Sequence, residues 1–148
     1  MKFPFVFSFP RSGLHLTSTI IGLELFVDFK LMNKTKNIIN KIKENKNQVL
    51  FTHKTSRMLD FDCINFILNE TKPIFLLRDP KDAITSWYYL LSKSSKKNIN
   101  SYEFITSPFR PNPEGIEYND KILLWKDHVR GYRKYENKLH KKFFILIC

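Results

Sequence analysis

Short apolar runs alternate along the chain with segments whose apolar residues recur at helical spacing. The apolar runs are typical of buried strands and cover residues 3–9, 48–52, 73–77 and 143–147. The helix-like segments cover residues 13 to about 29, 60–69, 80 to about 93, and about 119–139. This alternation predicts an α/β fold with a parallel β-sheet flanked by helices on both faces, in a single domain over residues 1–148.

The connection over residues 98–117 differs from the others because three prolines and a glycine interrupt it. We expect it to be irregular, because connections of this length in compact domains are often functional lids or disordered. Asp79 and Pro80, by contrast, are typical of a helix start. An Asp side chain caps exposed N–H groups, and proline suits the first helical position.

The chain is strongly basic, with 25 Lys and Arg residues against 14 Asp and Glu and a net charge of +11. Such a charge favours an anionic partner but does not choose one, and we interpret the lysine-rich residues 34–46 as a solvated surface. Cys63 and Cys148 form no CxxC pair, so neither a disulfide framework nor a zinc site is indicated. No apolar stretch approaches the roughly 20 residues of a membrane span, and we expect a cytoplasmic protein.

Polar and basic residues directly follow three of the predicted strands. Residues 10–16 (PRSGLHL) follow the first, Thr52-His53-Lys54 follows the second, and Arg78 ends the third. Because ligands of such sheets bind beyond the carboxyl ends of the strands, we expect these groups to converge on one site.

The segment at residues 10–16 is typical of a loop that cradles an anion. Gly13 allows the backbone to approach a ligand closely, the start of the following helix offers unpaired N–H groups, and Arg11 adds a positive charge. Ser86 lies eight residues after Arg78, in the second turn of the next helix. Arg78 and Ser86 can therefore reach one anion near that helix start.

Four segments together resemble the sulfotransferase family that uses 3′-phosphoadenosine 5′-phosphosulfate (PAPS). They begin at Pro10 (PRSG), Thr52 (TH), Leu77 (LRDPKDAITSWYY) and Trp125 (WKDHV), in the family's order. The R-D-P-x-D-x-x-x-S-x-Y run is the most specific of them. The resemblance covers nearly the whole chain and implies a P-loop-NTPase-like sulfotransferase fold.

The resemblance also implies PAPS as co-substrate and a hydroxyl or amine acceptor on a small molecule or a glycan. Arg78 and Ser86 match the residues that bind the 3′-phosphate. The 5′-phosphosulfate would be held by the first loop, whose candidate residues are Arg11, Ser12, Gly13, Leu14, His15 and Leu16.

Sulfuryl transfer needs a base for the acceptor proton and positive charge beside the departing phosphate. His53 is the candidate base because an imidazole titrates near neutral pH. Arg11 and the loop N–H groups would stabilise the charge that builds on the bridging oxygen. The chemistry requires no metal, and we expect His53 and Arg11 to be the catalytic residues.

The sequence departs from the family pattern in three places. Residues 14–16 replace a Thr-Thr-Trp run, so hydroxyl contacts to the phosphate and an aromatic platform under adenine are absent there. Phe51 stands where a lysine commonly precedes the Thr-His pair, and Lys54 would replace it only if the backbone turns it inward. The chain ends at Cys148, before the family's Gly-rich basic segment, so we expect it to correspond to the N-terminal portion of a sulfotransferase.

Other classes remain open. A P-loop nucleotide kinase would also begin with a strand, an anion loop and a helix, although this loop lacks G-x-x-x-x-G-K-[ST]. A non-catalytic or decayed sulfotransferase fragment and a basic nucleic-acid-binding protein are further alternatives, with nucleic acid the less expected partner. Steep salt dependence of DNA binding would identify the last of these.

Overall fold

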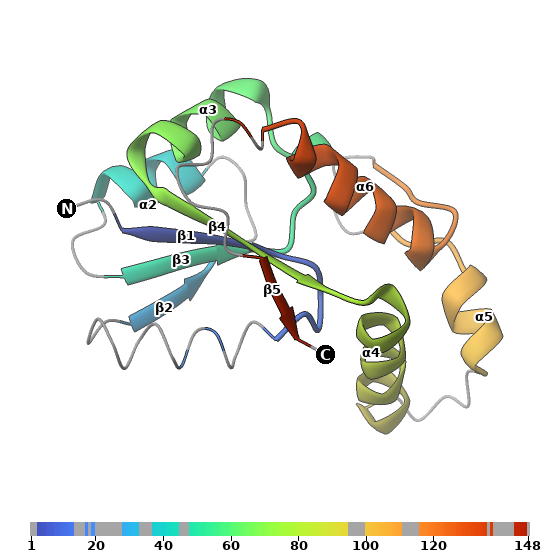
Figure 1. Ribbon diagram of the computed structural model, residues 1–148. Helices are drawn as coiled ribbons and strands as arrows, with labels where there is room; N and C mark the ends of the chain where they lie inside the picture. Colours follow the sequence, from blue (N-terminus) through green and yellow to red (C-terminus); the bar gives the residue numbers. More distant parts are fainter. Residues whose placement is uncertain are drawn as a thin grey trace.

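The computed structural model describes residues 3–13, 17, 19, 28–32, 37–44, 48–94, 100–110, 116–135, 137 and 144–147. Within them, five strands form one parallel sheet in the order β2-β3-β1-β4-β5 (Figure 1). The strands are β1 (Pro4–Ser8), β2 (Asp28–Leu31), β3 (Gln48–Thr52), β4 (Lys72–Arg78) and β5 (Phe144–Ile147).

The helices form two groups around this sheet. Their bounds are α2 (Ile38–Glu44), α3 (Phe61–Glu70), α4 (Pro80–Ser94), α5 (Ser101–Thr106) and α6 (Lys121–Arg133), with a short 3-10 turn, η2, at Ser56–Met58. Helices α2 and α3 contact each other over the sheet, whereas α4, α5 and α6 pack together beside the carboxyl ends of the strands (Figure 1). The second group therefore lies where the sequence predicts a ligand site.

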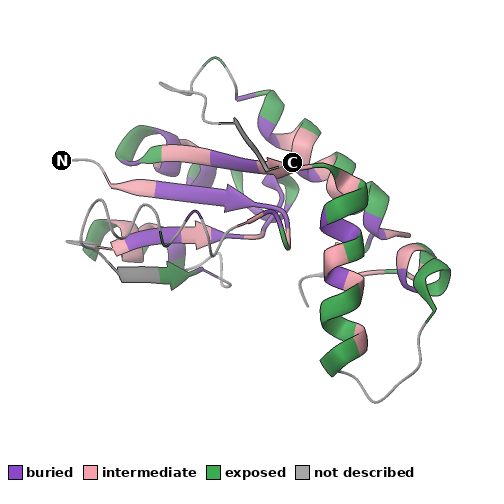
Figure 2. Ribbon diagram, turned by 60° about the horizontal axis from the view of Figure 1, so that its bottom comes forward, coloured by how far each residue is buried: buried purple, intermediate pink, exposed green. Residues whose placement is uncertain are grey.

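Both faces of the sheet are covered, as the apolar runs predict. Phe5 and Phe7 of β1 belong to the core cluster that includes α3, and the Phe7 ring stacks on Phe75 of β4 at 4.9 Å between centroids. Successive strand residues point to opposite faces. Val6 lies between these phenylalanines and is nevertheless buried, in a second cluster with Val49 and Leu76. The buried residues accordingly run along the central strands in Figure 2.

The sequence predictions for β1, β3, β4 and β5 and for α3 and α4 are confirmed within one or two residues. The side chain of Asp60 caps α3 by accepting a hydrogen bond from Cys63 N at 2.6 Å. Asp79 Oδ1 accepts one from Lys81 N at 2.9 Å at the start of α4. Helix α6 ends at Arg133, earlier than the predicted end near residue 139.

Two elements, β2 and α5, contradict the sequence predictions, and one helix, α2, was not predicted. The first helix was expected to reach about Phe29, but Asp28 and Phe29 begin β2, because this charged segment pairs in register with β3 at the edge of the sheet. Helix α2 lies within the lysine-rich residues 34–46 and buries Ile38. Helix α5 lies within the connection expected to be irregular, and Asn100 Oδ1 caps it by accepting from Glu103 N at 2.7 Å.

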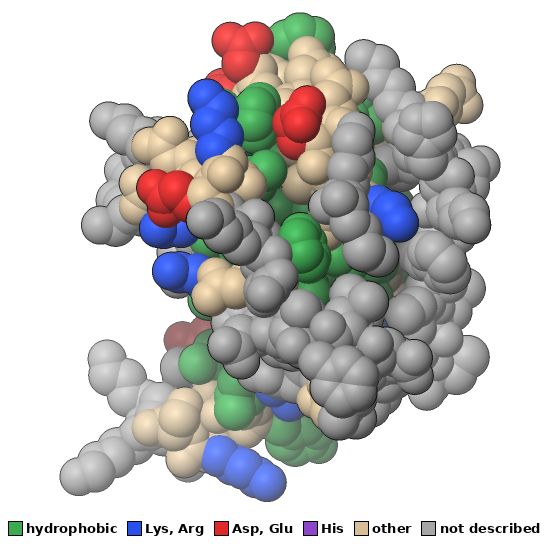
Figure 3. All heavy atoms as spheres, turned by 90° about the vertical axis from the view of Figure 1, so that its left-hand side faces the viewer, with side chains coloured by type: hydrophobic (Ala, Val, Ile, Leu, Met, Phe, Trp, Pro, Cys, Tyr) green, Lys and Arg blue, Asp and Glu red, His purple; other side chains and the backbone are tan. Residues whose placement is uncertain are grey.

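The charged side chains are mixed in sign on the face shown in Figure 3. Among the described side chains on its upper part, Lys and Arg lie near Asp and Glu. Within the described ranges, no helix is long and apolar enough to cross a membrane.

Candidate functional site

The three predicted motifs meet at one edge of the sheet. Strands β3, β1 and β4 are adjacent and parallel, with Phe7 opposite Thr52 and Ser8 opposite Leu76. The residues that follow these strand ends are therefore neighbours in space although they lie far apart in the sequence. The three groups therefore lie at one edge of the sheet, and that they form a single ligand site stays a prediction.

The loop after β1 is a tight turn with two residues of positive φ. Ser12 N donates to Phe9 O at 3.1 Å, and the φ angles are 66° at Arg11 and 81° at Gly13. Glycine adopts such angles at little cost, whereas a residue with a Cβ is strained there by about 1–3 kcal/mol. Ser12 is fully buried, and its Oγ has no hydrogen-bond partner among the described residues. Strain and an unpaired buried hydroxyl together mark this turn as a candidate ligand site.

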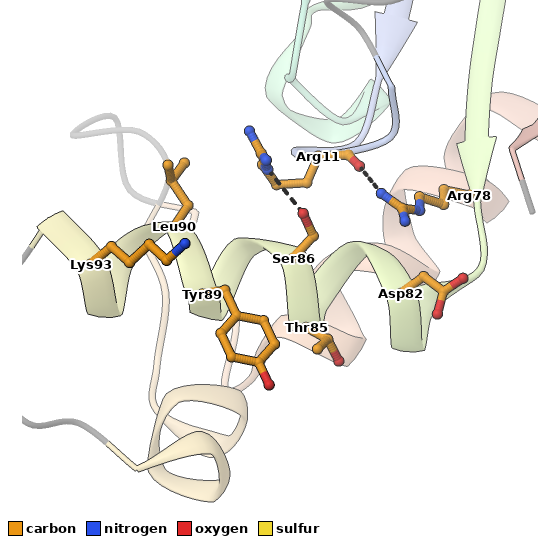
Figure 4. Close-up of a pocket in the computed structure, with 8 residues that line it drawn as sticks. All are labelled: Arg11, Arg78, Asp82, Thr85, Ser86, Tyr89, Leu90 and Lys93. Carbon is orange, nitrogen blue, oxygen red and sulfur yellow. Dashed lines mark hydrogen bonds between the residues drawn. The ribbon is translucent and has the colours of Figure 1, made fainter.

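Two arginines and a serine are joined by hydrogen bonds next to this turn (Figure 4). Arg11 Nε donates to Ser86 Oγ at 3.2 Å, and Arg78 Nη1 donates to Arg11 O at 3.2 Å. The indole of Trp125, on α6, donates to Arg78 O at 3.2 Å. Arg78 Nε is buried and has no partner in the described part of the chain. Arg11 is therefore bonded to Ser86 and Arg78 to the backbone of Arg11, so two cationic side chains and a hydroxyl lie close together, an arrangement suited to an anion.

These residues line a cleft of about 400 Å³ along α4, a volume within the usual range for small-molecule sites. The cleft is lined by Arg11, Arg78, Asp82, Thr85, Ser86, Tyr89, Leu90 and Lys93 (Figure 4). Among these described residues three cations accompany one carboxylate, a balance that favours an anionic ligand. Sequence reasoning did not identify Lys93, although its position seven residues after Ser86 places it on the same helix face.

His53 follows β3 and is held by Ser8 at the end of β1. Its Nδ1 lies 2.9 Å from Ser8 O and 3.0 Å from Ser8 Oγ. A carbonyl oxygen can only accept, so the neutral imidazole carries its proton on Nδ1 and keeps the lone pair on Nε2. Nε2 is the atom that can take a proton from a substrate. His53 is half-buried and is not among the residues that line the cleft beside Ser86.

Hydrogen bonds join the segment after His53 to α6 and to Tyr118, which forms an isolated β-bridge with Phe109 before α6. Tyr132 donates its hydroxyl hydrogen to Lys54 O at 2.6 Å. The Tyr118 hydroxyl donates to Asp127 Oδ2 at 2.5 Å and lies 3.0 Å from Thr55 Oγ1, from which it accepts. Burial and this bond to Asp127 raise the pKa of Tyr118 to about 12, so it remains a donor at neutral pH. These hydroxyls fix the backbone that carries His53.

The structure places the remaining predicted site residues differently from one another. Lys54 is buried, as an inward turn requires, but it is not part of the cleft lining. The candidates Leu14, His15 and Leu16 lie outside the described residues. The structure does bring together five of the candidates, namely Arg11, Ser12, Gly13, Arg78 and Ser86. The guanidinium of Arg11 faces Ser86.

His128 lies behind the site, on α6, and is fully buried. Its ring packs edge-on against Phe9 and Tyr132, with centroids 6.1 and 5.1 Å apart. Neither ring nitrogen has a hydrogen-bond partner among the described residues. Burial, with a smaller effect from the charge of His53, lowers the pKa of His128 to about 3, so this imidazole is neutral at physiological pH.

Known proteins share this architecture and part of the sequence. A mouse sulfotransferase, SULT7A1, solved in complex with PAP, superposes with a TM-score of 0.65 and 18% identity over 98% of this chain and 51% of its own. Shikimate kinase from Bacteroides thetaiotaomicron superposes with a TM-score of 0.58 and 13% identity over 97% of this chain and 85% of its own. At such identities the likeness shows the fold alone.

The chain spans about half the length of that sulfotransferase. None of the curated proteins matches its sequence. The sulfotransferase domain family, however, matches residues 4–146, which include every motif described above. The chain belongs to the sulfotransferase domain family.

Proposed function

We propose that this chain binds PAPS and takes part in sulfuryl transfer to a hydroxyl or amine acceptor on a small molecule or a glycan. The observation that carries the proposal is the convergence of Arg11, Arg78 and Ser86 on one cleft beside a strained, glycine-containing turn. Arg78 and Ser86 would bind the 3′-phosphate, and the turn would hold the 5′-phosphosulfate at the helix start. Membership of the family and the PAP found in the mouse structure support this assignment.

The proposed reaction assigns a role to each of these residues. The acceptor oxygen or nitrogen attacks sulfur, and the bond between sulfur and the bridging phosphate oxygen breaks, which releases PAP. The proton of the acceptor passes to His53 Nε2, because Nδ1 is committed to Ser8. Arg11 would stabilise the negative charge on the departing phosphate once its guanidinium turns from Ser86 toward the 5′ end of the ligand.

A thermal-shift titration with PAP tests the donor assignment. PAP should raise the Tm of the wild-type chain, because a ligand that binds only the folded state stabilises it by mass action. Arg78→Ala and Ser86→Ala should abolish the shift. Ser92→Ala is the matched control, since Ser92 lies on the same helix, bonds only to Tyr89 O in the described structure, and does not line the cleft. Absence of a shift at saturating PAP would reject the donor assignment.

A further inference from the structure

The cleft extends along α4 beyond the residues proposed to bind the donor. Tyr89, Leu90 and Lys93 follow Ser86 by three, four and seven residues, so they share its helix face, and all of them line the cleft. Seven residues correspond to about 10 Å along a helix axis. Lys93 therefore marks the far end of the cleft, two helical turns from Ser86.

The far end differs chemically from the donor end. Tyr89 and Leu90 are 58% and 47% exposed, so they offer apolar surface to a ligand. In Figure 4 the Lys93 side chain runs back along α4, with its ammonium group directed toward Ser86. Its ammonium makes no ion pair or hydrogen bond with any described residue. An apolar surface with one unpaired cation suits a ligand that has an apolar body and a single anionic group.

The contacts proposed for the donor do not include this end. In the proposed function, the turn at residues 10–13 and Arg78 with Ser86 would take the two phosphate positions of PAPS. A ligand at Tyr89 and Lys93 is therefore a second molecule next to the donor. We infer that Tyr89, Leu90 and Lys93 form an acceptor subsite, and that the acceptor is an aromatic or aliphatic alcohol that carries a carboxylate or another anionic group. This inference rests on the proposed function.

Two probes of nearly equal shape test the charge of the acceptor. We would titrate 4-hydroxyphenylacetate and its amide, 4-hydroxyphenylacetamide, into the chain by calorimetry, with and without saturating PAP. The carboxylate should bind about tenfold more tightly, since a hydrogen bond to a charged group contributes about 1.5–3 kcal/mol and 1.4 kcal/mol is tenfold. Lys93→Gln should remove this preference. Lys81→Gln should keep it, because Lys81 is exposed on the same helix and lies outside the cleft lining.

The outcomes separate this inference from the proposed function. Equal affinity for the two probes, or no binding of either, would overturn the acceptor subsite. A loss of PAP affinity in Lys93→Gln would also overturn it, because Lys93 would then belong to the donor site. If PAP fails to bind, the proposed function fails, and the titrations without PAP still decide whether Lys93 selects an anion.

Discussion

The buried imidazole of His128 should make the stability of the chain fall in mild acid. His128 is 1% exposed, and burial holds its pKa at about 3 against an ordinary value of 6.5. The unfolded chain therefore binds a proton at this residue below pH 6.5, whereas the folded chain does not. The contribution of His128 to the free energy of unfolding is therefore fully present above pH 6.5. It is lost progressively as the pH falls toward 3.

The size of the effect follows from the two pKa values. At pH 7.5 the unfolded His128 is almost entirely neutral, and the residue contributes no pH dependence. At pH 5, which is 1.5 units below its ordinary pKa, His128 is protonated in the unfolded chain but not in the folded chain. At 1.36 kcal/mol per unit, this difference lowers the free energy of unfolding by about 2 kcal/mol. This is a large part of the stability of a typical small domain.

Urea denaturation of the wild type and His128→Phe at pH 7.5 and 5.0 measures this contribution. The loss of unfolding free energy between the two pH values should be about 2 kcal/mol smaller in the variant. His128→Gln is a second non-titrating variant in case phenylalanine does not fit, and His53→Gln is a control that removes a half-buried histidine instead. Equal losses in the wild type and both His128 variants would refute the description of His128 as a buried, neutral group.

Two further predictions concern α6 and His53. In Gly131→Ala the new Cβ would lie 2.1 Å from Ser56 Oγ, and this overpacking should cost about 1–3 kcal/mol. Alanine regains about 1 kcal/mol of helix propensity, so the variant should be destabilised in urea by a net amount of up to about 2 kcal/mol. Adding Ser56→Gly should restore stability, and an unimpaired single variant would contradict the contact between α6 and η2. His53→Ala should bind PAP like the wild type and slow sulfuryl transfer from labelled PAPS to a phenol by about 10²–10⁴-fold. Retained turnover would remove His53 from the role of base.

The strands that are buried on both faces could be predicted from the sequence. Strands β1, β3 and β4 lie in the middle of a covered sheet, so their apolar runs are continuous. The edge strand β2 carries Asp28 and Lys30, and only its pairing with β3 makes it a strand. Helix α5 was missed although Asn100 and Glu103 have the spacing of a helix cap.

The sequence predicted that Arg11, Arg78 and Ser86 would lie near one another, but it did not predict the internal geometry of the candidate site. Strand order alone brings Arg11, His53 and Arg78 to one edge of the sheet. The bond between Arg11 and Ser86, by contrast, depends on the positive φ of Arg11, which no sequence pattern indicates. The proton position on His53 depends on a carbonyl of a neighbouring strand. Such details arise from strand register and turn geometry, so they appear only in the folded chain.

The most direct test of the central claim is a comparison of PAP with 5′-AMP, which lacks the 3′-phosphate. In calorimetric titrations, PAP should bind the wild-type chain at least tenfold more tightly, because the proposed role of Arg78 and Ser86 is to bind the 3′-phosphate, which 5′-AMP lacks. This preference should disappear in Ser86→Ala and Arg78→Ala and remain in Ser92→Ala. Equal affinity of the wild type for PAP and 5′-AMP would contradict the assignment of this cleft to the donor.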